Sequence, residues 1–105
     1  QKIYQGVYCM YSGPNFETPA EIKALRVLGG NAVGMSTVPE VLVANHCNLP
    51  VIAISVITNL AAGMNKTKLS HQETLENAGL AENNVLKLIK KFICEVKIDD
   101  TPRDN

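Results

Sequence analysis

Apolar runs alternate with short polar segments along this chain, and three of the changes carry the signature of a helix start. In each case a Ser or Thr follows an apolar run, and a Glu stands three residues later. In such a capping box the hydroxyl and the carboxylate bind backbone N–H groups that the first turn of a helix leaves without partners. Each box therefore indicates a step from strand to helix. The boxes begin at Thr18, Thr37 and Ser70 and close at Glu21, Glu40 and Glu73.

The apolar runs before the three boxes predict three strands. Residues 2–12 are rich in β-forming side chains, residues 31–33 form a short run, and residues 51–57 are apolar almost throughout. A nearly continuous apolar run is typical of a strand that helices cover on both faces. We therefore expect residues 51–57 to form a central strand.

Three helices are expected to follow these strands, over about residues 19–28, 38–45 and 71–96. Pro19 suits the first helical position, where its missing N–H is not needed, and Gly29 and Gly30 end that helix. The order βαβαβα predicts neighbouring strands that are mainly parallel. The side chains expected to reach the core are Ile22, Leu25, Leu28, Val41, Leu42, Ala44, Leu75, Leu86, Ile89 and Ile93.

The organisation of the chain points to part of one domain. We expect residues 1–96 to belong to a single α/β domain and residues 97–105 to be a polar, disordered tail. The loop over residues 60–69 is long and follows a strand end, which makes it the best candidate for a mobile lid. The chain begins without Met and holds fewer strands than a full three-layer domain usually has. We therefore expect it to be the later part of a longer protein.

Composition and charge exclude several kinds of partner. The formal net charge is zero and no basic patch is present, which argues against nucleic acid and against a membrane surface. The longest apolar stretch, residues 49–57, is too short to span a bilayer, and no signal peptide is visible. Three scattered cysteines without metal-type spacing indicate reduced thiols in a cytoplasmic protein.

Polar residues gather where the predicted strands end, which is where α/β proteins bind small molecules. Glu17 precedes a helix cap, so it is either a carboxylate favoured by the helix dipole or an acceptor aimed into a pocket. Phe16 beside it belongs either to the core or to the pocket wall. Thr58 and Asn59 directly follow the third strand and are placed to face the crevice. The Asn59 amide offers both a donor and an acceptor and does not ionise.

Two further positions leave a structural and a functional interpretation open. Ser36, which follows Met35, either assists the helix cap or binds an anion together with backbone N–H groups. His71 at a helix start is expected to be neutral, as a structural donor or a ligand contact, whereas His46 is expected to be structural. No Gly-rich phosphate loop, nucleophile elbow or metal set is present. Spacing alone thus indicates an α/β protein with a small-molecule site.

Several blocks of the chain resemble the C-terminal portion of the trimeric purine nucleoside phosphorylases, in family order over about residues 6–96. The resemblance implies a three-layer phosphorylase/hydrolase-like α/β fold with a mixed, mainly parallel sheet flanked by helices. This chain would be its C-terminal βαβαβα part. The matching blocks are Tyr8, SGPNFETPAE at 12–21, AVGMSTVPE at 32–40, ITN at 57–59, and His71.

The same resemblance implies an activity. Enzymes of that family are pentosyltransferases that carry out the reversible phosphorolysis of 6-oxopurine nucleosides and deoxynucleosides, such as inosine and guanosine. The products are the free base and (deoxy)ribose 1-phosphate, and the role is purine salvage. Orthophosphate is a co-substrate, and neither a cofactor nor a metal is used. The family further implies a homotrimer and a cytoplasmic location. The upstream part, which carries most of the phosphate site, is absent here, so this fragment alone is expected to be inactive.

The resemblance also assigns roles to individual residues. Glu17 would accept hydrogen bonds from purine N1–H and the 2-amino group, and Asn59 would meet N7 and O6, which makes these two the catalytic pair. A neutral donor fixed near N7 would bind the negative charge that the departing purine gathers better than it binds the ground-state base. The remaining roles are Phe16 and Thr58 for the base, Tyr8, Met35 and His71 for the ribose, and Ser36 for phosphate.

Two other functions stay open at this point. One is an enzyme of the same fold that acts on 6-amino substrates such as methylthioadenosine. An amide at position 59 argues against it, because a carboxylate would favour a 6-amino group whereas an amide N–H₂ can meet a 6-oxo group. The other is an inactive base-binding fragment that lacks the phosphate-binding half.

Overall fold

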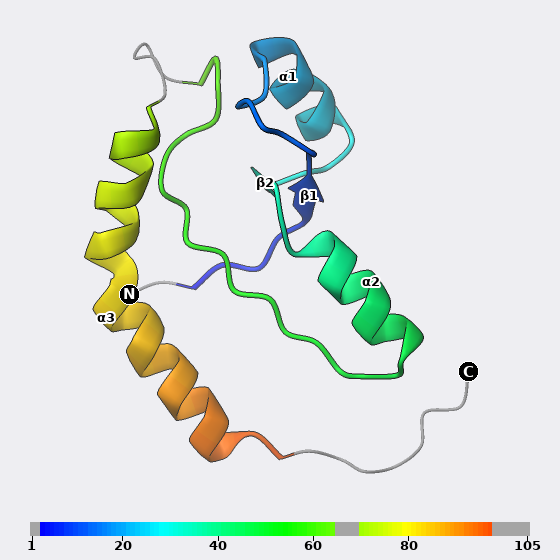
Figure 1. The fold of residues 1–105 in the computed structure, drawn as a ribbon, viewed down its shortest axis with the longest axis vertical. Helices are drawn as coiled ribbons and strands as arrows, with labels where there is room; N and C mark the ends of the chain where they lie inside the picture. The colour runs from blue at the N-terminus through cyan, green and yellow to red at the C-terminus, as the bar shows by residue number, and fades with distance from the viewer. Residues whose placement is uncertain (1–2, 65–69, 98–105) are drawn as a thin grey trace.

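The computed structural model describes residues 3–64 and 70–97. Its element order is β1 (Tyr8–Met10), α1 (Pro19–Val27), β2 (Ala32–Gly34), α2 (Val38–His46) and α3 (His71–Glu95). Figure 1 shows α1 and α2 at opposite ends of the strand pair, with α3 alongside and residues 47–64 running between α2 and α3. The predicted helices are all confirmed to within a residue or two.

Strands β1 and β2 pair in parallel, with α1 as the connection between them. Tyr8 lies opposite Ala32, and Met10 lies opposite Gly34. The predicted parallel pairing is confirmed, but the first strand is much shorter than the expected residues 2–12. A strand extends only as far as a neighbour offers hydrogen bonds, and β2 is three residues long.

The start of α1 has the predicted capping box in full. Thr18 N–H donates to Glu21 Oε2 at 2.7 Å, and Glu21 N–H donates to Thr18 Oγ1 at 3.3 Å. The start of α3 has the serine half of its box, in which Glu73 N–H donates to Ser70 Oγ at 3.1 Å.

The box predicted at Thr37 is wrong. Thr37 precedes α2 but makes no side-chain cap hydrogen bond, and its φ is +76°. That backbone conformation is rare for a β-branched residue. Its hydroxyl lies 3.1 Å from Ser36 Oγ instead. The sequence spacing of a capping box is thus satisfied here while the backbone geometry that the box needs is not.

The central strand predicted at residues 51–57 is also absent, although the segment is as apolar as expected. None of these residues has regular secondary structure, and the sheet of the described residues contains only β1 and β2. A strand exists only if a neighbour satisfies its backbone N–H and C=O groups. The apolar pattern therefore reports that the segment suits burial, but it does not say whether a partner strand lies in the same chain.

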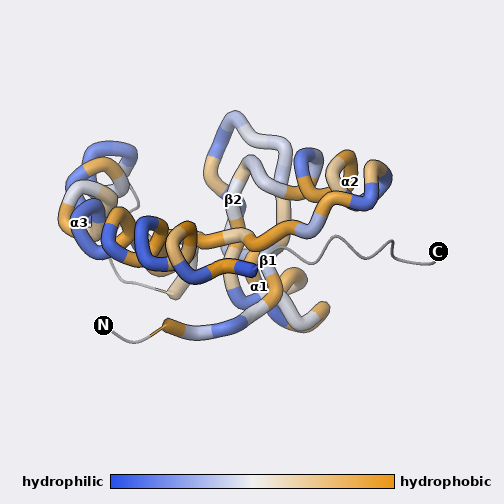
Figure 2. Tube along the Cα trace, turned by 90° about the horizontal axis from the view of Figure 1, so that it is seen from below, coloured by the Kyte–Doolittle hydropathy of each residue, from blue (hydrophilic) through white to orange (hydrophobic). Residues whose placement is uncertain are grey.

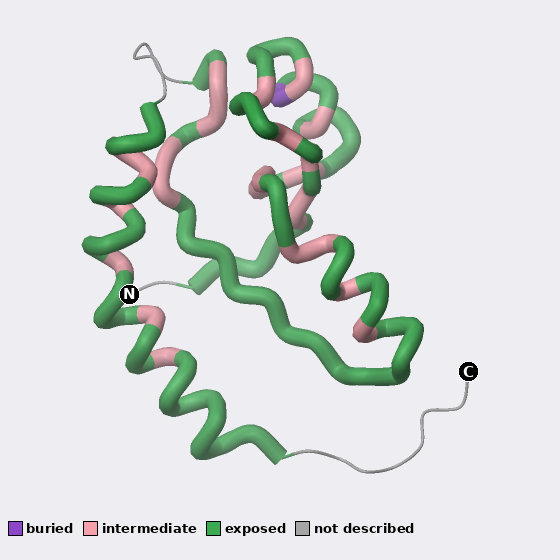
Figure 3. The backbone as a smooth tube through the Cα atoms, in the orientation of Figure 1, coloured by how far each residue is buried: buried purple, intermediate pink, exposed green. Residues whose placement is uncertain are grey.

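Burial is concentrated at one point. Ile22 on α1 is 8% exposed and is the buried hydrophobic residue of the described part of the chain; it is the purple position in Figure 3. Leu25, Val41 and Ala44 are half-buried, as predicted in part. The remaining core predictions are wrong for this structure, because these side chains are exposed: Leu28, Leu42, Leu75, Leu86, Ile89 and Ile93.

Exposed apolar side chains occur along much of the described chain, including residues 51–57 and α3. Ile52 is 67% exposed, Ile57 65% and Ile93 66%. Figure 2 shows a hydrophobic segment passing between α3 and α2. A second cavity of about 340 Å³ lies between α2 and residues 51–54. Exposed apolar side chains in such number are typical of a surface that binds another molecule or another part of a protein.

Cys9, Cys47 and Cys94 are free thiols, as predicted. In the part of the chain that the structure describes, no helix has both the length and the apolarity to cross a membrane. Most of the predicted lid, residues 65–69, and nearly all of the predicted tail, residues 98–105, lie outside the described residues.

Candidate active site

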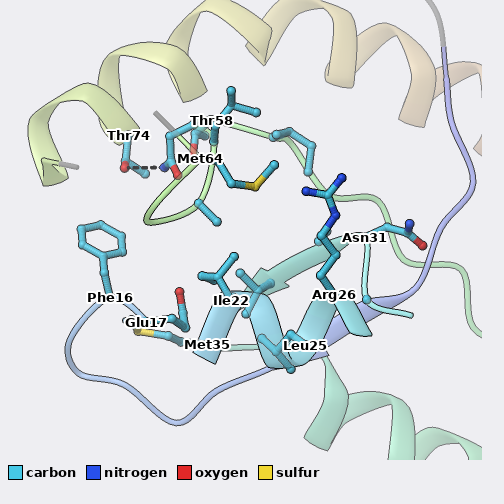
Figure 4. A pocket seen from close by; sticks show the side chains of 18 of the residues that line it. Phe16, Glu17, Ile22, Leu25, Arg26, Asn31, Met35, Thr58, Met64 and Thr74 are labelled. Atoms are coloured by element: carbon cyan, nitrogen blue, oxygen red, sulfur yellow. Dashed lines mark hydrogen bonds between the residues drawn. The ribbon is translucent and has the colours of Figure 1, made fainter. Parts of the chain in front are cut away.

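A cavity of about 560 Å³ lies between α1, β2 and the start of α3. Glu17 and Asn59 both line it. These two side chains are 42 positions apart in the sequence, and the fold brings them to one pocket. Phe16, Met35 and Thr58 line the same pocket. Figure 4 shows Phe16, Glu17 and Met35 on one side and Thr58 and Thr74 across from them.

Glu17 and Phe16 are positioned by the start of α1. The capping box begins at Thr18, the very next residue, so the hydrogen bonds that start the helix also set the path of the chain before it. Glu17 is half-buried, whereas Phe16 is 42% exposed. The wall next to them is apolar, because Ile22 and Leu25 of α1 contribute it. A flat ring with a polar edge fits such a wall.

Asn59 is held by hydroxyl groups on two segments. Its Nδ2 donates to Thr58 Oγ1 at 3.1 Å and to Thr74 Oγ1 at 3.2 Å. Asn77, one turn further along α3, donates from Nδ2 to the backbone oxygen of Thr58 at 2.6 Å. The start of α3 therefore holds both the side chain of Asn59 and the backbone just before it.

The predicted sugar and phosphate residues lie outside the lining of this pocket, except for Met35. The Tyr8 hydroxyl and Ser36 Oγ are 3.5 Å apart, at the geometric limit of a hydrogen bond. They form a second polar group with Thr37. Gly34 leaves room for this pair, because a Cβ at that position would collide with the Tyr8 hydroxyl. His71 is exposed at the first position of α3. The structure thus brings together the residues that were predicted to bind the base, with the polar group of Tyr8 and Ser36 outside the lining of that cavity.

Some residues of the site were not foreseen from the sequence. Thr74 and Asn77 hold the Asn59 segment, and Arg26, Asn31 and Met64 also line or border the cavity. Thr74 and Asn77 are three residues apart, so they share one face of α3. The sequence shows two polar residues on one helix face, but it does not show which loop they contact.

The charges in and near the pocket are few. Glu17 supplies a carboxylate and Arg26 a guanidinium to its lining, and Figure 4 shows Arg26 well apart from Glu17. Outside the pocket, the Thr18 backbone N–H and then its hydroxyl hold the pKa of Glu21 below its ordinary value of 4.5. No group of His, Cys, Asp and Glu side chains in residues 3–64 and 70–97 is arranged to hold a metal ion.

Comparison with known proteins assigns this chain to a family. The family model described as the phosphorylase superfamily matches residues 1–94. The chain belongs to this superfamily. Among curated relatives, purine nucleoside phosphorylase 1 of Bacillus subtilis is 48% identical over 93 residues, which is 89% of this chain and 34% of that protein. The mouse purine nucleoside phosphorylase is 46% identical over 97 residues, which is 90% of this chain and 33% of that protein.

Solved structures agree with the sequence relatives. The purine nucleoside phosphorylase of Schistosoma mansoni in complex with inosine superposes with a TM-score of 0.85 at 38% identity, over 91% of this chain and 35% of that one. The same protein in complex with adenosine gives a TM-score of 0.84. The predicted resemblance and α/β fold class are therefore confirmed. The chain spans about a third of the length of these relatives.

Proposed function

We propose that the intact protein carrying this chain is a purine nucleoside phosphorylase that prefers 6-oxopurine nucleosides, such as inosine and guanosine, and releases the free base and (deoxy)ribose 1-phosphate. The observation that carries the proposal is the convergence of Glu17 and Asn59 on one cavity of about 560 Å³. Relatives of this name at 45–48% identity support it. A solved relative with bound inosine and another with bound guanosine support the substrate class.

The two side chains suit the two edges of a 6-oxopurine. A carboxylate accepts from N1–H and from a 2-amino group, and an amide can both donate and accept near O6 and N7. A base that lacks N1–H would leave the half-buried Glu17 without a donor, and that is a strong basis for discrimination. Phe16 and Thr58 would complete the base pocket, and Asn59 would act as the group that stabilises the departing purine through a hydrogen bond.

The sugar and phosphate would lie beside this pocket. Tyr8, Met35 and His71 are proposed to contact the ribose, and Ser36 the phosphate. The proximity of Tyr8 to Ser36 supports a polar surface there. Orthophosphate is the proposed co-substrate, and the proposed reaction needs neither a metal nor an organic cofactor.

The rest of the intact protein is the proposed partner of this segment. The exposed apolar residues 51–57 would then find their strand neighbours there, and the phosphate site would be completed. We further propose a cytoplasmic homotrimer that acts in purine salvage. Light scattering of the intact protein tests the assembly, and a mass close to that of the monomer would contradict it.

Phosphorolysis assays test the function. The intact protein is incubated with phosphate and with inosine, guanosine, adenosine or methylthioadenosine, and base release is followed by chromatography. We expect kcat/KM for inosine and guanosine to exceed that for the 6-amino substrates by about 100-fold or more, because a base without N1–H leaves the half-buried Glu17 carboxylate unpaired. Omission of phosphate is expected to abolish turnover, and a chelator to leave it unchanged. Preference for adenosine or methylthioadenosine would overturn the proposal.

A 6-amino specificity is the second candidate, because one solved relative contains adenosine. The same substrate panel separates the two. Base binding without turnover in the intact protein would instead indicate an inactive base-binding protein.

A further inference from the structure

The hydrogen bonds around Asn59 assign an orientation to its amide. Both recorded hydrogen bonds of this side chain use Nδ2, and both acceptors are threonine hydroxyls, Thr58 Oγ1 and Thr74 Oγ1. An amide has its donors on nitrogen and its acceptor sites on oxygen. With Nδ2 directed at the two threonines, Oδ1 is the atom of Asn59 that is left for the pocket.

The Thr74 hydroxyl does not suit both orientations of the Asn59 amide equally, because its single hydrogen is already donated to another group. Thr74 Oγ1 donates to the backbone oxygen of Ser70 at 3.2 Å. While that bond is made, the hydroxyl can only accept toward Asn59. If the amide turned over, the hydroxyl would have to give up its bond to Ser70 in order to donate to Oδ1, so that orientation costs one hydrogen bond. Ser70 is itself fixed by its cap hydrogen bond with Glu73 N–H, so the orientation is held from the helix start.

We propose that Thr74 is a positioning residue that keeps the Asn59 amide turned with Oδ1 toward the purine, so that the pocket selects a base carrying a hydrogen on N7. The inference rests on the proposed function and deepens it. An acceptor at this edge repels the lone pair of an unprotonated N7 and binds N7–H. It thus favours a departing purine that takes up a proton from solvent on N7 over the bound nucleoside, and an interaction that strengthens from the ground state to the transition state is what catalysis requires. In this proposal the amide oxygen of Asn59, rather than its N–H₂ group, faces N7.

Two isomeric bases test the orientation. 9-Deazahypoxanthine carries a hydrogen on N7, whereas 7-deazahypoxanthine has a carbon there, and both keep N1–H and O6. Their dissociation constants are measured by calorimetry on the intact protein and on Thr74→Val, which keeps the side-chain shape but removes the acceptor. We expect the variant to bind 9-deazahypoxanthine about five- to tenfold more weakly, the fold-change of one hydrogen bond. We expect the 7-deaza isomer to change by less than about twofold.

Three controls separate positioning from a general structural effect. Thr74→Ser keeps the hydroxyl and is expected to restore 9-deazahypoxanthine binding. Asn83→Ala places a truncation on the exposed surface of the same helix and is expected to change neither constant. In an Asn59→Ala background, Thr74→Val is expected to have no further effect, because the group that it orients is gone.

The outcomes are distinguishable. Equal weakening of both isomers by Thr74→Val, failure of Thr74→Ser to restore binding, or an undiminished effect in the Asn59→Ala background would each overturn the assignment of Thr74. Turnover of inosine by the unchanged protein together with any of these results would leave the proposed function standing. An unchanged protein that binds neither isomer and does not cleave inosine would overturn both.

Discussion

Two regions of the molecule differ in how completely they are held. In the unit β1–α1–β2, backbone hydrogen bonds join the strands, a full capping box starts the helix, and Ile22 is buried. In the unit formed by residues 47–64 and α3, most of the large apolar side chains are exposed, and residues 51–57 pair with no strand among the described residues. The loop and the helix of this unit are joined by two side-chain hydrogen bonds, from Asn59 to Thr74 and from Asn77 to the backbone oxygen of Thr58.

This difference shows how the two main side chains of the site, Glu17 and Asn59, are positioned. Glu17 stands on the unit that is held by backbone pairing and a cap, so local structure suffices to place it. Asn59 stands on the other unit, and it is placed by side-chain hydrogen bonds with Thr74 and, through its neighbour's backbone, with Asn77. One half of the proposed base pocket therefore depends on local structure and the other on tertiary contacts.

The largest expected effect is on Asn59. In the intact protein, Asn59→Ala should lower kcat for inosine by roughly 100- to 1,000-fold, about 3–4 kcal/mol, as for the loss of other preorganised hydrogen-bonding groups that stabilise a transition state. Steady-state kinetics with inosine measures this, with Asn83→Ala on the exposed surface of α3 as the matched control. A loss of less than tenfold would show that the less completely held region does not carry the chemistry.

The next effect concerns the stability of the better-held region. Ile22→Ala should lower the free energy of unfolding by about 2–3 kcal/mol, because it removes a buried side chain and leaves a cavity. Denaturant unfolding of the ligand-free intact protein measures this. Lys23→Ala, exposed on the same helix, should change stability by less than about 0.5 kcal/mol. Equal effects of the two substitutions would contradict the idea that α1 anchors this unit.

Glu17 tests the edge of the purine opposite Asn59. Glu17→Gln should lower kcat/KM for inosine by about 10- to 100-fold, the range for hydrogen bonds to a charged group. Because adenosine lacks N1–H, its kcat/KM should fall much less, so the ratio of the two substrates narrows. Glu82→Gln, exposed on α3, serves as the control. An unchanged ratio would remove Glu17 from base recognition.

The smallest effect is the acid dependence of the α1 cap. Hydrogen bonds from the Thr18 N–H and hydroxyl lower the pKa of Glu21 in the folded protein below 4.5. The carboxylate therefore contributes stability that is present above pH 4.5 and is lost as the pH falls through the folded pKa. The stability difference between the protein and Glu21→Gln should shrink over that range, as measured by denaturant unfolding at several pH values. A difference that is constant with pH would show that the cap does not depend on the charge.

Much of the local structure could be predicted from the sequence, because its causes are local. The bounds of α1, α2 and α3 follow from helix periodicity, Pro19 and Gly29, and the Thr18 box is present as its spacing indicates. Thr37 has the same spacing without the box, because its positive φ moves its hydroxyl away from the helix. The sequence spacing makes a capping box possible, but the backbone conformation at the N-cap residue decides whether the box forms.

The residues of the candidate site also divide into those that the sequence identified and those that it did not. Motif positions identified Glu17 and Asn59, and the superfamily match agrees with the resemblance on which their roles rest. Thr74 escaped prediction because a hydroxyl on a helix has no sequence signal for the loop that it meets. The apolar run 51–57 showed a need for burial, and pairing depends on which neighbours are present.

By itself, the sequence determined the helices, the parallel strand pair, the family and the residue types available at the strand ends, because these depend on neighbours in the chain and on motifs that read directly from it. Only the tertiary structure decided that an acid and an amide 42 positions apart face one cavity, and which way the amide turns. Hydrogen bonds between distant segments carry that information, since a donor and an acceptor become a pair only when the fold brings them within about 3 Å.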